Sequence, residues 1–158
     1  MLHESHGVGS LVFGTDGTLL VSAGDGASYV RDDVGSASET YYAQALADGI
    51  IPSQQNVGAL RAQQLESYNG KILRIDPETG NGMASNPFYE SGNPASVRSK
   101  VWSLGFRNPF RMALKPGSGS TNPADGRPGV LYVGDVGYGL WEDLNVVTRA
   151  GMNFGWPL

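Results

Sequence analysis

Short apolar runs separated by turn residues dominate the pattern of this chain. The first two runs, residues 11–13 and 19–23, flank the sequence Gly14-Thr15-Asp16-Gly17. Because Asp-Gly favours the tight bend between antiparallel strands, this stretch predicts a β-hairpin. Five further runs predict strands at residues 71–75, 101–104, 112–114, 130–133 and 144–147. The pattern therefore predicts an all-β chain of short strands.

One long segment, residues 27–68, interrupts this rhythm. Ser36 and Glu39 have the spacing of a capping box, and Tyr42, Ala45 and Leu46 follow at helical offsets. This predicts a short helix that Gly49 ends, and residues 57–65 predict a further helical turn or two. We therefore expect a helical insert around residues 36–65, and a surface loop at residues 116–129.

Glycine and proline content narrows the fold class. The chain has 23 glycines and 9 prolines among 158 residues and is 40% hydrophobic, which indicates a folded protein with many turns. An apolar strand followed by Gly-Asp occurs twice, at Gly24-Asp25 and at Gly134-Asp135. Such repetition favours a β-propeller, of which the predicted strands supply about two blades at four strands each. Two architectures remain open on these grounds: a small β-sandwich or an incomplete propeller.

Charge and cysteine content exclude several classes of protein. The net charge is −4 and the 11 basic residues are scattered, so no basic face for nucleic acid is expected. With no cysteine, disulfides and thiolate metal sites are excluded. No apolar run approaches the roughly 18 residues of a membrane span. The first six residues do not have the pattern of a signal peptide.

Few residues offer catalytic chemistry. His3 and His6 are the only histidines, and a zinc site is disfavoured because no third ligand of matching type is near. We expect His3 at the surface, and His6 at the mouth of the first strand, where it could act as a general base. Arg107 could clamp local carbonyls or hold an anionic ligand, and both interpretations stay open.

Several acidic residues lie in glycine-rich turns. Asp135, Glu142 and Asp143 could direct oxygen ligands toward calcium, whereas simple turn capping is expected for Asp25. For Phe154 and Trp156 we expect packing in the core.

Several motifs, in a fixed order, resemble one known family. They are His6-Gly7-Val8-Gly9-Ser10-Leu11-Val12-Phe13-Gly14, Gly24-Asp25-Gly26, Gly70-Lys71-Ile72-Leu73-Arg74, Asn86-Pro87-Phe88, Leu104-Gly105-Phe106-Arg107-Asn108-Pro109, and Gly134-Asp135-Val136-Gly137 with Trp141-Glu142-Asp143-Leu144-Asn145 and Asn153-Phe154-Gly155-Trp156-Pro157. Together they resemble the soluble quinoprotein glucose and aldose sugar dehydrogenases of the glucose/sorbosone dehydrogenase type.

The resemblance implies a six-bladed β-propeller, of which residues 1–158 would form one incomplete domain with roughly half the blades. It implies pyrroloquinoline quinone (PQQ) and Ca²⁺ as cofactors, an aldose oxidised at its C1 hydroxyl, and an electron acceptor. His6 would be the catalytic base. Arg107 would stabilise charge on the quinone and contact the cofactor, which Asn108 would help to hold.

The resemblance also implies two calcium positions. The carbonyls of Gly137 and Tyr138 would bind the ion beside PQQ, and Asp143 with the carbonyl of Phe154 would bind a structural ion. Tyr138, Asp143 and Phe154 depart from the residues usual at these positions, which are proline, glutamate and tyrosine. These departures bear on the calcium positions more than on the fold.

A non-catalytic propeller that binds a glycan or a protein is the competing hypothesis. Basic residues downstream of Leu158 would favour the enzyme, and their absence would favour the binding module. The resemblance further implies a periplasmic or secreted protein whose signal lies upstream. We expect the isolated chain to be inactive, and to be unstable or to self-associate through exposed apolar faces.

Overall fold

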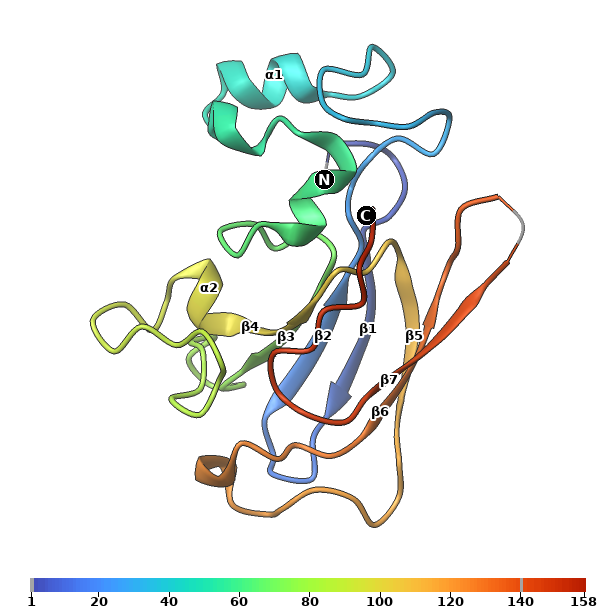
Figure 1. The fold of residues 1–158 in the computed structure, drawn as a ribbon. Helices are drawn as coiled ribbons and strands as arrows, with labels where there is room; N and C mark the ends of the chain where they lie inside the picture. The colour runs from blue at the N-terminus through green and yellow to red at the C-terminus, as the bar shows by residue number, and fades with distance from the viewer. Residues whose placement is uncertain (1, 140) are drawn as a thin grey trace.

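A computed structural model describes residues 2–139 and 141–158 of the chain and shows two antiparallel sheets (Figure 1). The first sheet has the order β1-β2-β3-β4, and the second has the order β5-β6-β7. The bounds are β1 (Val8–Phe13), β2 (Leu19–Ala23), β3 (Lys71–Ile75), β4 (Val101–Leu104), β5 (Pro109–Leu114), β6 (Leu131–Asp135) and β7 (Asp143–Val147). The mostly β architecture and the first hairpin are thus confirmed, since β1 pairs with β2 across the predicted bend.

The core lies where the two sheets face each other. Alternation along β6 places Leu131 and Val133 inside and Tyr132 outside, as a half-buried strand requires. The buried cluster comprises Leu20, Ile72, Trp102, Phe106, Met112, Leu131, Val133 and Val147. Residues from six strands and the turn after β4 therefore close one apolar layer between the sheets.

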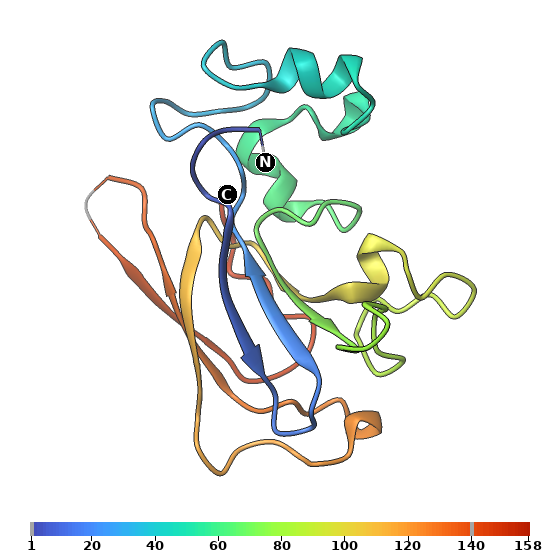
Figure 2. The same cartoon turned by 180° about the vertical axis from the view of Figure 1, so that it is seen from behind.

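The strands β1 and β5 approach each other closely and join the two sheets. A Cβ atom at Gly9 would lie 2.4 Å from the carbonyl oxygen of Pro109, so only glycine fits at this crossing. Figure 2 shows these two strands side by side from behind. The start of β1, shortly after His6, is thereby fixed beside the start of β5, shortly after Arg107.

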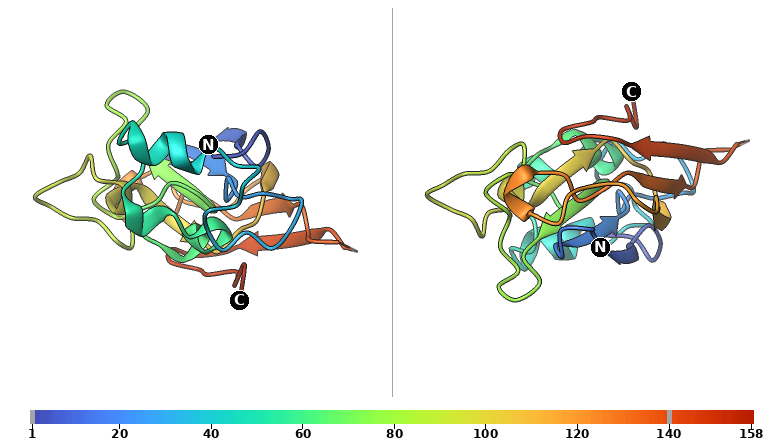
Figure 3. Two further views of the ribbon diagram at one scale, coloured as in Figure 1. Left: turned by 90° about the horizontal axis from the view of Figure 1, so that it is seen from above. Right: turned by 90° about the horizontal axis from the view of Figure 1, so that it is seen from below.

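The insert lies over one end of the sheets, as the views in Figures 1 and 3 show. It contains α1 (Tyr42–Ala47) and the short 3₁₀ segments η1 (Ser53–Gln55) and η2 (Gly58–Gln63). The predicted helix is present, but its predicted capping box is absent. Tyr41 precedes α1 without a side-chain cap, and Glu39 instead accepts hydrogen bonds from Ser28 and Arg31.

The remaining elements are α2 (Val97–Lys100) and η3 (Pro123–Asp125), the latter within the predicted loop at 116–129. None of the helices in the described ranges combines the length and apolarity needed to cross a lipid bilayer.

The described part of the chain holds two sheets, whereas half of a six-bladed propeller would hold three. The expected share of roughly half the blades is therefore too large. The long insert explains the difference, because residues between β2 and β3 add length without adding a strand to either sheet.

Candidate functional site

His6 lies in the turn that leads into β1 and is almost fully buried. Its backbone adopts a φ of 57°, the left-handed region that non-glycine residues rarely occupy. Gly24, at the end of β2, makes this turn possible, because a Cβ there would lie 2.6 Å from the carbonyl oxygen of His6. Strained backbone of this kind often accompanies functional residues.

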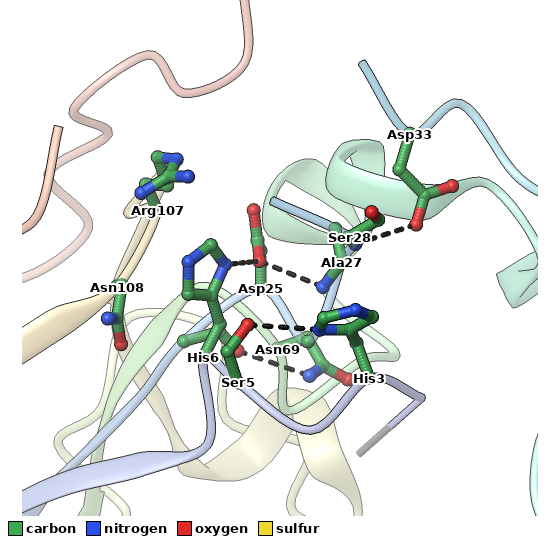
Figure 4. Close-up of polar contacts among 12 residues, drawn as sticks. His3, Ser5, His6, Asp25, Ala27, Ser28, Asp33, Asn69, Arg107 and Asn108 are labelled. Carbon is green, nitrogen blue, oxygen red and sulfur yellow. Dashed lines mark hydrogen bonds and ion pairs between the residues drawn. The ribbon is translucent and has the colours of Figure 1, made fainter. Parts of the chain in front are cut away.

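The imidazole of His6 is held by Asp25, as Figure 4 shows. Nδ1 of His6 lies 2.8 Å from Oδ1 of Asp25, whose side chain is fully buried. A carboxylate only accepts hydrogen bonds, so Nδ1 carries the hydrogen. In the neutral ring the other nitrogen, Nε2, then keeps its lone pair and is the atom able to take up a proton.

Asp25 also ties together segments that are distant in the sequence. Its carboxylate accepts hydrogen bonds from the Ala27 amide at 2.9 Å and from Nε1 of Trp156 at 2.8 Å. Its own amide donates to the carbonyl of Arg107 at 2.8 Å. Asp25 therefore connects His6, the predicted base, to the segments that carry Arg107 and Trp156.

Three sequence-based expectations need correction at this point. Asp25 does cap its turn through Ala27, but it also binds His6, a role that no sequence signal indicated. Trp156 does more than pack, because its indole N–H donates to Asp25. His3 is buried rather than exposed, with Nδ1 3.1 Å from the Ser5 hydroxyl and its ring against Tyr29.

Arg107 follows the positive-φ turn at Gly105 after β4. Its backbone amide and that of Asn108 both donate to the carboxylate of Asp135, at 3.1 and 2.6 Å. Burial raises the pKa of Asp135 to about 6, against the lowering effect of these two hydrogen bonds. The Asp135 side chain thus fixes the backbone on which Arg107 and Asn108 are presented.

The guanidinium of Arg107 borders a cleft of about 410 Å³. Its central carbon lies 5.4 Å from the ring centre of Tyr138 and 5.6 Å from that of Trp156. The cleft is lined by Gly105, Arg107, Asp135, Gly137, Tyr138, Trp141, Asp143, Asn145, Phe154, Gly155, Trp156 and Leu158. The two ring centres lie 6.0 Å apart, so the guanidinium sits beside a pair of aromatic rings, which suits a flat, anionic ligand.

A second hollow of about 390 Å³ adjoins the cleft, since both are lined by Tyr138 and Trp156. Its other wall belongs to the insert, with Ser28, Arg31, Asp32 and Asp33 among its lining residues. A hydrogen bond to Asp32 raises the pKa of Tyr138, which indicates that the insert contacts the rim of the cleft. The long insert therefore contributes to the site.

The structure brings most predicted site residues to one place. Arg107, Gly137, Tyr138, Asp143 and Phe154 all line the cleft. His6 does not line it. It borders a separate hollow of about 690 Å³ beside the insert and is linked to the cleft through Asp25. Asn108 lies next to Arg107, and Figure 4 shows His6, Arg107 and Asn108 in the same region.

The predicted calcium ligand Gly137 lies beside the guanidinium of Arg107. The carbonyl oxygens of Val136 and Gly137 both accept hydrogen bonds from Nη1 of Arg107, at 3.0 Å each. These oxygens therefore converge on a positive group, which is the donor chemistry that a hard cation uses. Among residues 2–139 and 141–158, no three acidic or histidine side chains cluster as a metal site.

Comparison with known proteins gives a consistent result. The chain is 28% identical to the HIPL2 protein of Arabidopsis thaliana over 97% of this chain and 18% of that protein. It is 27% identical to quinoprotein glucose dehydrogenase B of Acinetobacter calcoaceticus, over 98% of this chain and 26% of that protein. The PQQ-bound aldose sugar dehydrogenase of Streptomyces coelicolor has a similar fold, with a TM-score of 0.61 at 24% identity.

That structural match covers 99% of this chain and 31% of the Streptomyces protein, so the chain spans at most about a third of these three relatives. The family model for glucose/sorbosone dehydrogenase matches residues 2–158. The chain therefore belongs to the glucose/sorbosone dehydrogenase family.

Proposed function

We propose that the protein is a quinoprotein oxidoreductase that oxidises the C1 hydroxyl of an aldose sugar with PQQ as cofactor. Membership of the family and the likeness to a quinoprotein glucose dehydrogenase support this assignment. The observation that carries it is the 2.8 Å contact between Nδ1 of His6 and the buried carboxylate of Asp25. A histidine oriented in this way is equipped to remove a proton from a hydroxyl group.

In this proposal Nε2 of His6 takes the hydroxyl proton of the sugar. Asp25 stabilises the imidazolium that forms, because its fully buried carboxylate lies within hydrogen-bond distance of Nδ1. PQQ, when bound, supplies the electron sink that receives the hydride from C1. The remaining donors on Asp25, from Ala27 and Trp156, keep its carboxylate in place while His6 changes charge.

The residues of the cleft fit the cofactors. Arg107 offers a planar cation to an anionic ring system, and Tyr138 and Trp156 offer aromatic faces. Asn108 would help to hold the cofactor. The carbonyls of Gly137 and Tyr138 would hold Ca²⁺, which supplies a Lewis acid, and the pair of Asp143 with the Phe154 carbonyl would hold a structural ion.

The substrate partners follow from the same proposal: an aldose and an electron acceptor that reoxidises the cofactor. In a six-bladed propeller the two sheets described here would be two of the blades, and the remaining blades would come from other parts of the protein. Periplasmic or secreted location remains a prediction that rests on the family resemblance.

The test is reconstitution of the full-length protein with PQQ and Ca²⁺, followed by sugar-dependent dye reduction. We expect activity with at least one aldose, and loss of that activity in His6→Ala. Asp125→Asn, an exposed turn residue, is the matched control and should leave the rate unchanged. A protein that binds no PQQ and reduces no dye would favour the non-catalytic binding module.

A further inference from the structure

The side chain of Arg107 makes contacts that are unusual for a residue expected to face a cofactor. Nη1 donates to the carbonyl oxygens of Val136 and Gly137, both at 3.0 Å. Within the described ranges, no carboxylate accepts a hydrogen bond from this guanidinium, since Asp135 binds only backbone amides. The positive charge of Arg107 is therefore matched by backbone dipoles and by the aromatic rings of Tyr138 and Trp156, without a carboxylate hydrogen-bonded to it.

We infer that Arg107 and a divalent cation compete for these carbonyl oxygens. A cation ligated by the Gly137 carbonyl would share its oxygen with Nη1, and two positive charges on one oxygen repel each other. Occupation of the site by a cation therefore requires the guanidinium to leave. This inference rests on the proposed function, because that proposal names Ca²⁺ as the cation and PQQ as the anionic cofactor.

The displaced guanidinium has a place to go. Arg107 lines the cleft of about 410 Å³, where an anionic ligand would offer acceptors for its planar fork. An anion that draws Arg107 away from the carbonyls also frees them for the cation. Cation and anion thus bind with positive cooperativity, and by linkage each raises the affinity for the other by the same factor.

The direct test is calcium titration of the full-length protein by calorimetry, without PQQ. Arg107→Gln removes the competing positive charge, so we expect Ca²⁺ to bind about tenfold more tightly than in the wild type, a change typical of losing one charged hydrogen bond. Arg111→Gln is the matched control. Arg111 lies on β5 and donates to the Gly9 and Phe110 carbonyls, so its loss removes a positive charge that does not donate to the carbonyls of Val136 and Gly137.

A calcium affinity of Arg107→Gln no higher than that of Arg111→Gln would overturn the inference. Arg107→Lys provides a second variant if the glutamine protein does not fold. It retains the charge without the fork, and we expect an affinity between those of wild type and Arg107→Gln. The lysine variant binding calcium as weakly as wild type, or more weakly, would contradict the competition.

Repeating the titration with saturating PQQ measures the coupling. In the wild type PQQ should tighten Ca²⁺ binding, and in Arg107→Gln this enhancement should shrink by about the tenfold already gained without PQQ. A coupling of equal size in both proteins would contradict the exchange of Arg107 between carbonyls and anion. The calcium titration without PQQ tests the competition even if no sugar supports dye reduction. Failure of the proposed function can therefore be distinguished from failure of this inference.

Discussion

Asp25 is the residue on which the candidate site depends most. It is fully buried, and three donors surround its carboxylate: His6, Ala27 and Trp156. Burial of a charge is costly unless hydrogen bonds replace water, and here they do. A single carboxylate therefore sets both the orientation of the histidine and the position of the indole at the cleft.

Replacing Asp25 with asparagine should abolish the basic form of His6 while preserving the size of the side chain. An asparagine that donates its amide N–H to Nδ1 would favour hydrogen on Nε2, the tautomer in which Nε2 cannot take the proton of the sugar. We expect dye reduction to fall by about 10²–10⁴-fold. Steady-state kinetics check this, with circular dichroism to confirm folding. Activity within a few-fold of wild type would remove Asp25 from the proposed mechanism.

Lys71 provides a second prediction at the scale of a residue. It is fully buried on β3, and its ammonium donates to the carbonyls of Arg61, Ala62 and Asn69. Burial lowers the pKa of Lys71 from 10.5 to about 7. Between these values the unfolded chain binds more protons than the folded one, so this residue's contribution to stability increases as the pH rises from about 7 to 10.5.

The prediction concerns the difference in unfolding free energy between the wild type and Lys71→Met. Relative to Lys71→Met, the wild type should gain unfolding free energy on the order of 4 kcal/mol across that window. Urea titrations of the full-length protein at several pH values measure this. Lys115→Met, at an exposed lysine, should show no such trend relative to wild type. A difference that is constant with pH would contradict the lowered pKa.

At the scale of elements, the end of β2 positions the histidine turn. Gly24 lies so close to His6 that an added Cβ would meet the carbonyl oxygen, the carbonyl carbon and the Cα of His6 within 2.6–2.9 Å. The amide of Gly24 also donates to the carbonyl of Gly7. The first hairpin and the His6 turn are therefore one packed unit, and the geometry of the base depends on a residue with no side chain.

Gly24→Ala should disturb this unit. Because the clash is with backbone rather than a flexible side chain, we expect a loss of about 1–3 kcal/mol in unfolding free energy and a lower rate of sugar oxidation. Gly92→Ala is the control, since a Cβ atom added there would meet nothing within 4 Å and its effect should stay within about 0.5 kcal/mol. Equal stability of the two variants in urea would show that the turn can shift to accommodate a methyl group.

Sequence alone predicted the strands well because their burial is local. Alternation along β6 reports which face is covered, and turn residues mark the strand ends. In β3 the polar residues Lys71 and Arg74 are buried as well, which the alternation in the sequence did not indicate. The capping-box prediction at Ser36 and Glu39 was wrong because Glu39 meets Ser28 and Arg31 instead, contacts that local spacing does not encode.

Predicting the site was harder for the same reason. An aspartate after a strand resembles an ordinary turn residue, so Asp25 could not be separated from a capping residue without its partners 19 and 131 positions away. The preceding and following glycines, Gly24 and Gly26, were the available signal, because they allow the backbone of His6 and the side chain of Asn69 to approach the chain closely on either side of Asp25.

At the scale of the whole molecule, two apolar faces lie open. On one side Leu11 and Phe13 of β1 are each 62% exposed, and on the other Leu144 of β7 is 70% exposed, with Tyr132 and Val146 beside it. Apolar surface of this kind indicates a partner surface. In the proposed propeller, neighbouring blades would cover both faces.

The isolated chain of 158 residues should therefore self-associate. We expect it to elute well above its monomer mass of 16.7 kDa in size-exclusion chromatography, with a broad thermal transition. Leu11→Lys combined with Leu144→Lys places a charge on each face and should shift elution toward the monomer. A monomeric chain that unfolds in one sharp transition would contradict the prediction that other parts of the protein cover these faces.

The hydrogen bond between Trp156 and Asp25 has a consequence for synthesis of the protein. The ribosome adds His6 and Asp25 before Trp156, and the indole that completes the environment of Asp25 arrives 131 residues after that aspartate. The same tryptophan is tied to Gly105 and Gln63 through its backbone. A nascent chain that has not reached this tryptophan holds its histidine beside an incompletely bonded carboxylate, so the finished arrangement arises only once both sheets have emerged.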